Sequence, residues 1–174
     1  MKYIETILIL LITVFLLSCA GAPEITSSHK PGIFLNKTDK ISIIPSKIGG
    51  SDDIVLPDAL ETEFLKYGFN VIERTTVRQM VQENGLDFTE ILNGEEYLKL
   101  GEVTSVRYIV LVNSRISGLG VSSATMKVID LNDNGIIFSS TYTQPSPDNP
   151  NYINFENIND TAERMIKSLL PIVK

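Results

Sequence analysis

The sequence opens with an apolar segment that ends at the only cysteine of the chain. The run spans residues 7–17 and is followed by Ser18 and Cys19. It is shorter than the ~20 apolar residues that a membrane-spanning helix needs, and its length is typical of the hydrophobic part of an export signal. Because a lone cysteine forms no disulfide within its own chain, we expect the exported part to be stabilised by its core alone.

The residues around the cysteine resemble the lipobox of bacterial lipoprotein precursors. Leu16, Ser18 and Cys19 match a pattern in which a small residue admits the signal peptidase and the thiol carries a diacylglycerol. This resemblance implies a signal peptide at residues 1–18 and lipidation of Cys19. Acyl chains at ~0.8 kcal/mol per buried methylene would then attach the chain permanently to a membrane. Ala20, which stands where a retention Asp would stand, favours the outer membrane, with the domain facing the periplasm.

An ordinary secretory signal is the alternative interpretation of the same segment. Cleavage near Ala20 or Ala22 would leave Cys19 in the leader, and the mature chain would then have no cysteine. Both interpretations predict an exported protein.

Composition divides the rest of the chain into two parts. Residues 19–38 are rich in Ser, Pro, Gly and Thr, which predicts a lipidated N-terminus and a flexible tether. Residues 39–174 have the length of a single domain that buries its own core. The formal net charge is −6, and Lys and Arg are scattered singly. Nucleic-acid binding, which requires clustered basic residues, is therefore not expected, and no charge attraction to anionic lipid is expected either.

Hydrophobic periodicity predicts a strand over residues 40–45, a helix from residue 51 or 52 to 67, and a strand over 69–73. Thr76 and Gln79 have the spacing of a capping box that opens a helix over residues 77–83. A short helix over residues 95–100 ends at Gly101, which we expect to act as its C-terminal cap.

The second half of the chain has the clearer signals. Residues 108–112 form a continuous apolar run, typical of a central strand that is buried on both faces. Two strands over residues 124–131 and 136–143 flank an Asn- and Gly-rich turn and predict a hairpin. An amphipathic helix follows over about residues 157–170. These elements predict an α/β (α+β) fold with a single mixed β-sheet of about five strands and helices packed against it.

The sequence holds no motif of a catalytic or metal-binding site. His29 is the only histidine, and it lies in the expected tether. Three pairs of carboxylates could hold a cation or share a proton, although a helix start or a turn already explains each one; they are Asp52 with Asp53, Glu95 with Glu96, and Asp130 with Asp133. We expect a protein that is not an enzyme and has no cofactor and no metal. A hydrolase or small-ligand site at Asp130 and Asp133 is a minor alternative.

The order of the segments resembles the curli-secretion lipoprotein family (CsgG-like). Four stretches carry the resemblance; they are KISIIP at residues 40–45, GFNVIER at 68–74, RYIVLVNSRISG at 107–118 and VIDLNDNGIIFSS at 128–140. The resemblance implies a CsgG-like α/β domain over residues 39–174.

Pore-forming members of that family insert two long β-hairpins per subunit into a membrane. Residues 117–123 are too few for one, because each spanning strand needs ~9 to 11 residues. The second insertion point, after Tyr142, holds three prolines that would interrupt strand pairing. The chain therefore resembles the soluble relatives, which include lipoproteins that activate cell-wall synthases.

These observations favour a non-catalytic accessory lipoprotein of cell-envelope assembly that binds an unidentified envelope protein. The loop over residues 144–155 is a candidate contact surface, because Tyr152 and Phe155 lie on a proline-rich segment. The two aromatic side chains could equally pack into the core. The alternative function is that of a subunit in a curli-type oligomeric secretion or export assembly, which makes the chain a homo-oligomer.

Overall fold

The computed structural model describes residues 23–46, 54–93, 97–117, 120–132, 134–144 and 156–174. Within these residues a mixed sheet of six strands runs in the order β1-β6-β5-β4-β2-β3. β2 pairs in parallel with β3 and β4, and the other pairs are antiparallel. The strands are β1 (Glu24–His29), β2 (Lys40–Pro45), β3 (Asn70–Val71), β4 (Tyr108–Ser117), β5 (Gly120–Asp130) and β6 (Gly135–Thr143).

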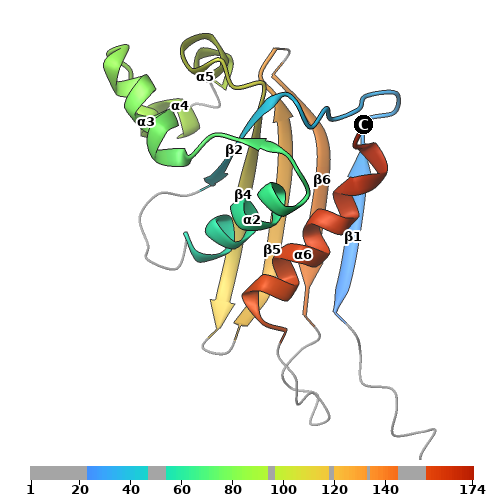
Figure 1. The fold of residues 1–174 in the computed structure, drawn as a ribbon. Helices are drawn as coiled ribbons and strands as arrows, with labels where there is room; N and C mark the ends of the chain where they lie inside the picture. The colour runs from blue at the N-terminus through green and yellow to red at the C-terminus, as the bar shows by residue number, and fades with distance from the viewer. Residues whose placement is uncertain (1–22, 47–53, 94–96, 118–119, 133, 145–155) are drawn as a thin grey trace, which may run out of the picture.

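Helices cover both faces of this sheet (Figure 1). The front face carries α2 (Val55–Lys66) and α6 (Ile158–Leu169), which lie side by side. The other face is covered at one end by α3 (Arg74–Glu83), α4 (Phe88–Asn93) and α5 (Tyr97–Thr104). A short 3-10 helix, η2 (Leu170–Ile172), follows α6. The predicted α+β fold with one mixed sheet is confirmed, and no helix in the described residues is long and apolar enough to cross a membrane.

Strand β4 separates two hydrophobic clusters, as expected of a strand that is buried on both faces. Tyr108 and Val110 face the larger cluster under α2 and α6. Ile109, which alternates with them, faces the smaller cluster under α3, α4 and α5. The prediction of an interior strand at residues 108–112 is therefore confirmed, although β4 continues to Ser117.

Helix α6 follows its sequence signal closely. Asn157 is the N-cap, and its side-chain Oδ1 accepts a hydrogen bond from the backbone N–H of Asp160 at 2.9 Å. One stripe of the helix is buried in the larger cluster; it contains Ala162, Met165, Ile166 and Leu169. The strong periodicity of this segment made its position predictable.

The prediction of a flexible tether over residues 19–38 is wrong for residues 23–38, the part of this range that the structure describes. Residues 24–29 form β1, an edge strand that pairs antiparallel with β6, from Glu24 opposite Thr143 onward. Leu35 is fully buried, and its backbone N–H donates to the carbonyl oxygen of Ile172 at 2.8 Å. The domain therefore begins before residue 39 and has six strands. β1 lacks an alternating apolar signal because Ile25 is its only partly buried residue and backbone pairing holds it.

Two local predictions ahead of β4 are also wrong. α3 begins at Arg74, and its N-cap is Glu73, so Thr76 and Gln79 form no capping box; the Gln79 side chain instead donates to Glu83 at 2.8 Å. Gly101 does not end a helix but lies inside α5. A Cβ at this position would come within 2.9 Å of the Cβ of Leu131, so close packing of α5 on the residue that follows β5 explains the glycine.

Candidate docking surfaces

Most residues that the sequence singled out lie outside the described part of the chain. These residues are Cys19, Tyr152, Phe155, Asp52, Asp53, Glu95, Glu96 and Asp133. Their predicted roles stay predictions. Asp130 and His29 are described, and His29 is exposed on the edge strand β1.

Asp130 is engaged in the structure of the hairpin. Its Oδ2 forms an ion pair with Arg107 Nη2 at 2.7 Å, and its Oδ1 accepts a hydrogen bond from the backbone N–H of Asn132 at 2.9 Å. The hydrogen bond to Asp130 raises the pKa of the Arg107 guanidinium. With a side chain only 7% exposed, Asp130 joins the start of β4 to the end of β5. This arrangement supports the structural interpretation of this carboxylate over the catalytic one.

The described residues contain no group of three or more His, Cys, Asp and Glu side chains that could hold a metal ion. Two pockets and two exposed faces of the described domain are places where another molecule could dock.

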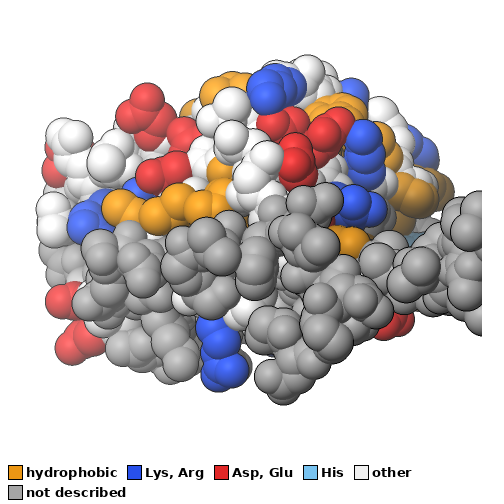
Figure 2. Space-filling model, turned by 90° about the horizontal axis from the view of Figure 1, so that it is seen from below, with side chains coloured by type: hydrophobic (Ala, Val, Ile, Leu, Met, Phe, Trp, Pro, Cys, Tyr) orange, Lys and Arg blue, Asp and Glu red, His pale blue; other side chains and the backbone are white. Residues whose placement is uncertain are grey.

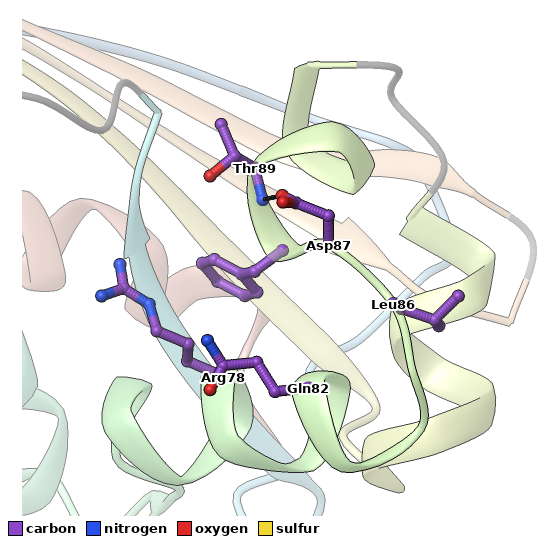
Figure 3. Close-up of a pocket in the computed structure, with 6 residues that line it drawn as sticks. Arg78, Gln82, Leu86, Asp87 and Thr89 are labelled. Atoms are coloured by element: carbon purple, nitrogen blue, oxygen red, sulfur yellow. Dashed lines mark hydrogen bonds between the residues drawn. The ribbon is translucent and has the colours of Figure 1, made fainter.

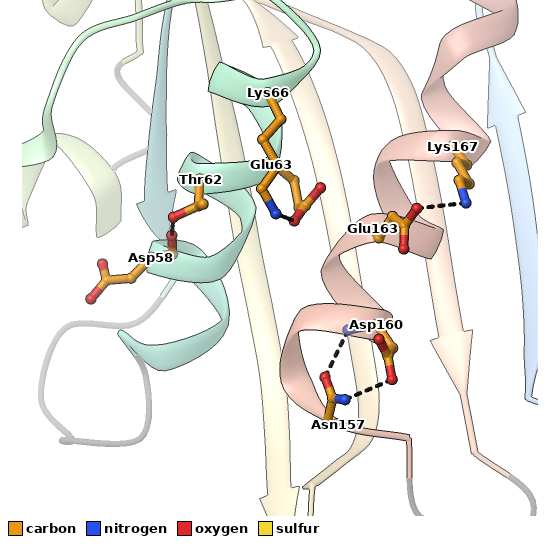
Figure 4. A network of polar contacts seen from close by, with 8 residues as sticks. All are labelled: Asp58, Thr62, Glu63, Lys66, Asn157, Asp160, Glu163 and Lys167. Carbon is orange, nitrogen blue, oxygen red and sulfur yellow. Dashed lines mark hydrogen bonds and ion pairs between the residues drawn. The ribbon is translucent and has the colours of Figure 1, made fainter.

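The first surface is the charged front formed by α2 and α6 (Figure 4). Within α2, Lys66 forms an ion pair with the nearly buried Glu63 at 2.6 Å. Within α6, Lys167 pairs with Glu163 at 2.7 Å. The hydrogen bond from Lys167 lowers the pKa of Glu163, and the hydrogen bond to Glu63 raises the pKa of Lys66. Because these charges are paired with charges of the opposite sign, the front has no electrostatic potential of a single sign.

An open pocket of about 310 Å³ lies on α6 beside this front. Its lining residues are Glu156, Asp160, Glu163, Arg164 and Lys167. Arg164 is paired with Glu156 at 2.7 Å, and that hydrogen bond raises the pKa of Arg164. Two ion pairs therefore line the pocket, together with the carboxylate of Asp160, which accepts a hydrogen bond from the Asn157 amide at 2.7 Å.

A second pocket of about 240 Å³ lies where α3 meets α4 (Figure 3). Arg78 lies over the ring of Phe88, with 5.6 Å between the guanidinium carbon and the ring centroid. Asp87 Oδ1 accepts from the backbone N–H groups of Thr89 and Glu90 at 2.7 and 3.0 Å. Asp87 therefore fixes the start of α4, and the pocket presents a cation on an aromatic ring.

Exposed apolar side chains lie on several elements, and the most exposed of those described is Leu65 on α2, at 56%. Leu98 on α5 is 43% exposed, and Ile136 at the start of β6 is 51% exposed. Phe34 is 44% exposed and lies under Lys174, whose Nζ is 3.8 Å from the ring centroid. The sequence analysis missed these residues, since a single apolar residue in a polar segment gives no periodic signal.

A further surface is the rear face of the sheet, beyond the part that α3, α4 and α5 cover. Hydroxyl and amide side chains form rows across four strands, of which one contains Asn113, Thr125, Thr141 and Thr26. A parallel row contains Arg115, Ser123, Thr143 and Glu24. All of these side chains are exposed or half-buried. This face is consequently hydrophilic and extends from β4 to the edge strand.

No protein-family model matches the sequence, and no curated protein matches it in sequence. Solved structures are similar in fold. A PelC dodecamer from Paraburkholderia phytofirmans matches with a TM-score of 0.50 and 12% identity, over 86% of this chain and 95% of the PelC chain. A second PelC dodecamer structure from the same organism matches with the same TM-score and 11% identity, over 86% of this chain and 96% of that chain. At this identity the likeness to PelC shows the fold alone.

Two further solved structures match with lower scores. Lipoprotein GNA1162 from Neisseria meningitidis has a TM-score of 0.49 and 12% identity, over 76% of this chain and 94% of that chain. The LpoB C-terminal domain from Escherichia coli has a TM-score of 0.48 and 11% identity, over 62% of this chain and 83% of that chain.

Proposed function

We propose that this chain is a lipid-anchored accessory lipoprotein of the cell envelope, of the CsgG-like superfamily, that binds a protein partner and catalyses no reaction. The observation that carries the proposal is the place of the lipobox residues Leu16 to Cys19. They stand directly ahead of β1, so the only cysteine lies next to a folded domain. The engagement of Asp130 with Arg107 supports a binding role over a chemical one.

Lipidation is tested by comparing the full chain with Cys19→Ser in a Gram-negative host. We expect the parent chain to incorporate labelled palmitate and to sediment with outer membranes, and the variant to lose the label. Ser27→Ala, a change outside the lipobox at an exposed position of β1, is the matched control and should keep the label. A Cys19→Ser chain that still carries the label would contradict the proposal.

The loop over residues 144–155 is the proposed contact surface for the partner. Its test is the double variant Tyr152→Ala and Phe155→Ala in crosslinking on intact cells. We expect the crosslinked partner band to disappear while the circular dichroism spectrum is unchanged. The control Phe34→Ala removes an exposed aromatic side chain elsewhere. If the double variant keeps the band and its fold, the loop is not the contact surface.

A homo-oligomeric export assembly is the second candidate function. The fold likeness to PelC, whose solved structure is a dodecamer, favours it. The mass of the lipidated particle, extracted in mild detergent and corrected for bound detergent, distinguishes the two. A monomer or dimer is expected for the accessory lipoprotein, and a large closed oligomer for a subunit of an export assembly.

A further inference from the structure

We infer that two copies of this chain associate through their edge strands, by antiparallel pairing of β1 with the partner's β1 about Ser27. The two six-stranded sheets then become one continuous sheet. This interface goes beyond the proposed function, and it does not depend on the lipidation of Cys19.

The outer edge of β1 is open in the described residues. β1 is the end strand of the sheet, and β6 is the strand with which it pairs. Figure 1 shows β1 at the side of the sheet, with α6 in front of the sheet rather than over this edge. Folded proteins commonly protect an edge with a very short strand, a lysine, a proline or a bulge. The other edge strand, β3, has only two residues, whereas the six residues of β1 contain no lysine, no proline and no bulge.

Hydrogen bonds on the inner side determine which backbone groups of β1 point outward. The backbone N–H of Lys30 donates to the carbonyl oxygen of Ile137 at 2.9 Å, in register with the pairs of β1 and β6. Gln144 N–H donates to the carbonyl oxygen of Ser122 at 3.0 Å, so the even-numbered residues of β6 bond to β5 and its odd-numbered residues face β1. Bonded and non-bonded pairs alternate in an antiparallel ladder. The N–H and C=O groups of residues 25, 27 and 29 therefore point to the open edge.

Two prolines restrict the register in which a second strand can pair with this edge. Pro23 and Pro31 stand at equal distances from Ser27, and both are odd-numbered, as the outward residues are. Because a proline has no N–H to donate, the outward donors are confined to the three odd-numbered residues between them. An antiparallel second copy pairs all three, with two hydrogen bonds per pair, only when Ser27 lies opposite the partner's Ser27. A shift by two residues places a proline opposite an outward residue and loses hydrogen bonds.

The side chains of the two strands complement one another in this register. Ile25 packs against the larger cluster, so the odd-numbered residues of β1 face the front and the even-numbered residues face the rear. On the rear, each Glu24 lies opposite the partner's Lys30, which gives two pairs of opposite charge. Each Thr26 lies opposite the partner's Ser28, which gives two pairs of hydroxyl groups. Cross-strand pairs of both kinds stabilise antiparallel strands.

The overall charge of the chain makes these local pairs decisive. Two copies that each carry a net charge of −6 repel one another at long range. In Figure 2 the described side chains are acidic and basic groups side by side, without a basic field that would attract a second acidic chain. At about 0.15 M salt, charges farther apart than ~8 Å are largely screened, so the contacts within the strand pair decide whether the copies associate.

The first test is a disulfide between two copies in the membranes of a Gram-negative host. Ser27→Cys in the full chain places two thiols in the central hydrogen-bonded pair. The two Cα atoms there would lie about 5.5 Å apart, which a disulfide can bridge. After oxidation with copper phenanthroline, we expect most of this variant to migrate as a dimer on a non-reducing gel. The parent chain, whose only thiol belongs to Cys19, and Glu102→Cys, an exposed position on α5, are the controls and should remain monomeric on the gel.

A second pair of cysteine variants tests the register. Two copies of Ser28→Cys would place their Cα atoms roughly 8 Å apart, beyond the reach of a disulfide, and the same holds for two copies of Thr26→Cys. We expect each variant alone to crosslink several times less than Ser27→Cys. Co-expression of the two variants brings position 26 of one chain opposite position 28 of the other, and the dimer band should return.

The third test exchanges the charges at the ends of the strand. Glu24→Lys and Lys30→Glu each place like charges opposite one another twice, so each should raise the Kd of the dimer about tenfold. The double variant restores both pairs of opposite charge and should return the Kd to that of the parent chain. The Kd is obtained from the mass of the full chain in mild detergent over a range of concentrations, and circular dichroism shows whether each variant keeps its fold.

Four outcomes decide the matter. A chain that stays monomeric at every concentration, or a Ser27→Cys variant that crosslinks no more than the parent, overturns the inference. Crosslinking of Ser27→Cys to a different protein assigns the edge to that protein and overturns it as well. A large closed oligomer without the Ser27→Cys crosslink overturns it and favours the export assembly. A Ser27→Cys dimer in a chain that carries no palmitate label supports this interface and rejects the proposed anchoring alone.

Discussion

The two faces of the sheet are stabilised in different ways. On the front, α2 and α6, each of 12 residues, lie over the larger hydrophobic cluster along much of the length of the sheet. On the rear, helices of 10, 6 and 8 residues cover one end only, and rows of Ser, Thr and Asn side chains face water beyond them. The difference indicates that apolar packing on the front holds the fold, whereas the rear has regions that are free to bind.

The strongest test of this comparison uses two fully buried leucines. Leu60 on α2 belongs to the larger cluster, and Leu100 on α5 belongs to the smaller one. Replacement of such a leucine by Ala costs ~2–5 kcal/mol in the free energy of unfolding. We expect Leu60→Ala near the upper end of this range and Leu100→Ala near the lower end, because a helix with fewer neighbours relaxes into the cavity. Urea unfolding measures both, and equal losses would contradict the comparison.

The next largest effect is expected at Gly101. The methyl group of Gly101→Ala would meet Leu131, which packs against α5, so overpacking should cost ~1–3 kcal/mol. The neighbouring exposed change Glu102→Ala is the control and should remain within ~0.5 kcal/mol of the parent. Adding Leu131→Gly, which removes the Cβ that the new methyl group meets, to Gly101→Ala should cost less than the sum of the two single changes. If the free-energy costs of the two changes were additive, α5 would be shown to move away from Leu131 without penalty.

A third test compares two nearly buried carboxylates, one at the end of β5 and one on helix α2. Asp130 pairs with Arg107, which is 38% exposed, whereas Glu63 pairs with Lys66, which is 63% exposed. Asp130→Asn should cost ~1–2 kcal/mol, because it leaves the guanidinium without its charged partner. Glu63→Gln should cost less, since water already screens Lys66. Thermal unfolding of both variants would refute this ranking if Glu63→Gln were the more damaging change.

The smallest expected effect concerns Glu61 on α2. Burial, followed by the nearby charges of Asp58 and Glu73, raises its pKa. A folded-state pKa above the unfolded one means that the ionised carboxylate destabilises the fold, so the penalty is present at neutral pH and disappears as the pH falls below the unfolded pKa. Glu61→Gln should therefore stabilise the protein at neutral pH by less than ~0.5 kcal/mol, with the gain lost at acidic pH.

The control for this change is Glu102→Gln on α5, an exposed position on the rear side. Urea unfolding of both variants from neutral pH down to about pH 4 covers the ionisation of a carboxylate. If the gain in the free energy of unfolding from Glu61→Gln grew as the pH fell, its pH dependence would be opposite to the expected one. That result would reject burial as the cause of the raised pKa of Glu61.

The sequence analysis succeeded where one segment carries its own periodic signal. β2, the interior part of β4, the β5–β6 hairpin and α6 were found because apolar residues recur in them with the period of a strand or a helix. β1 was missed because an edge strand with exposed side chains has no such period. Gly101 was misread because its reason lies in Leu131, which is distant in sequence.

The same limit applies to the candidate surfaces. The hydrogen bond that Asp130 accepts from Asn132 lies in the turn that the sequence predicts, but its partner Arg107 lies 23 residues earlier and no local pattern connects the two. The contact between the Arg78 guanidinium and the ring of Phe88 depends on how α3 packs against α4, a helix that was not predicted. Pairwise contacts of this kind come from the tertiary fold rather than from local sequence.

The pairing of β1 with β6 also has a consequence for the order of folding steps. Glu24 stands early in the chain, but its partner Thr143 follows only after most of the domain. Closing so long a loop is entropically costly and slow compared with local contacts, so β1 stays unpaired until late in folding. The edge of the sheet at β6 consequently stays open while the other five strands assemble, and β1 closes it last.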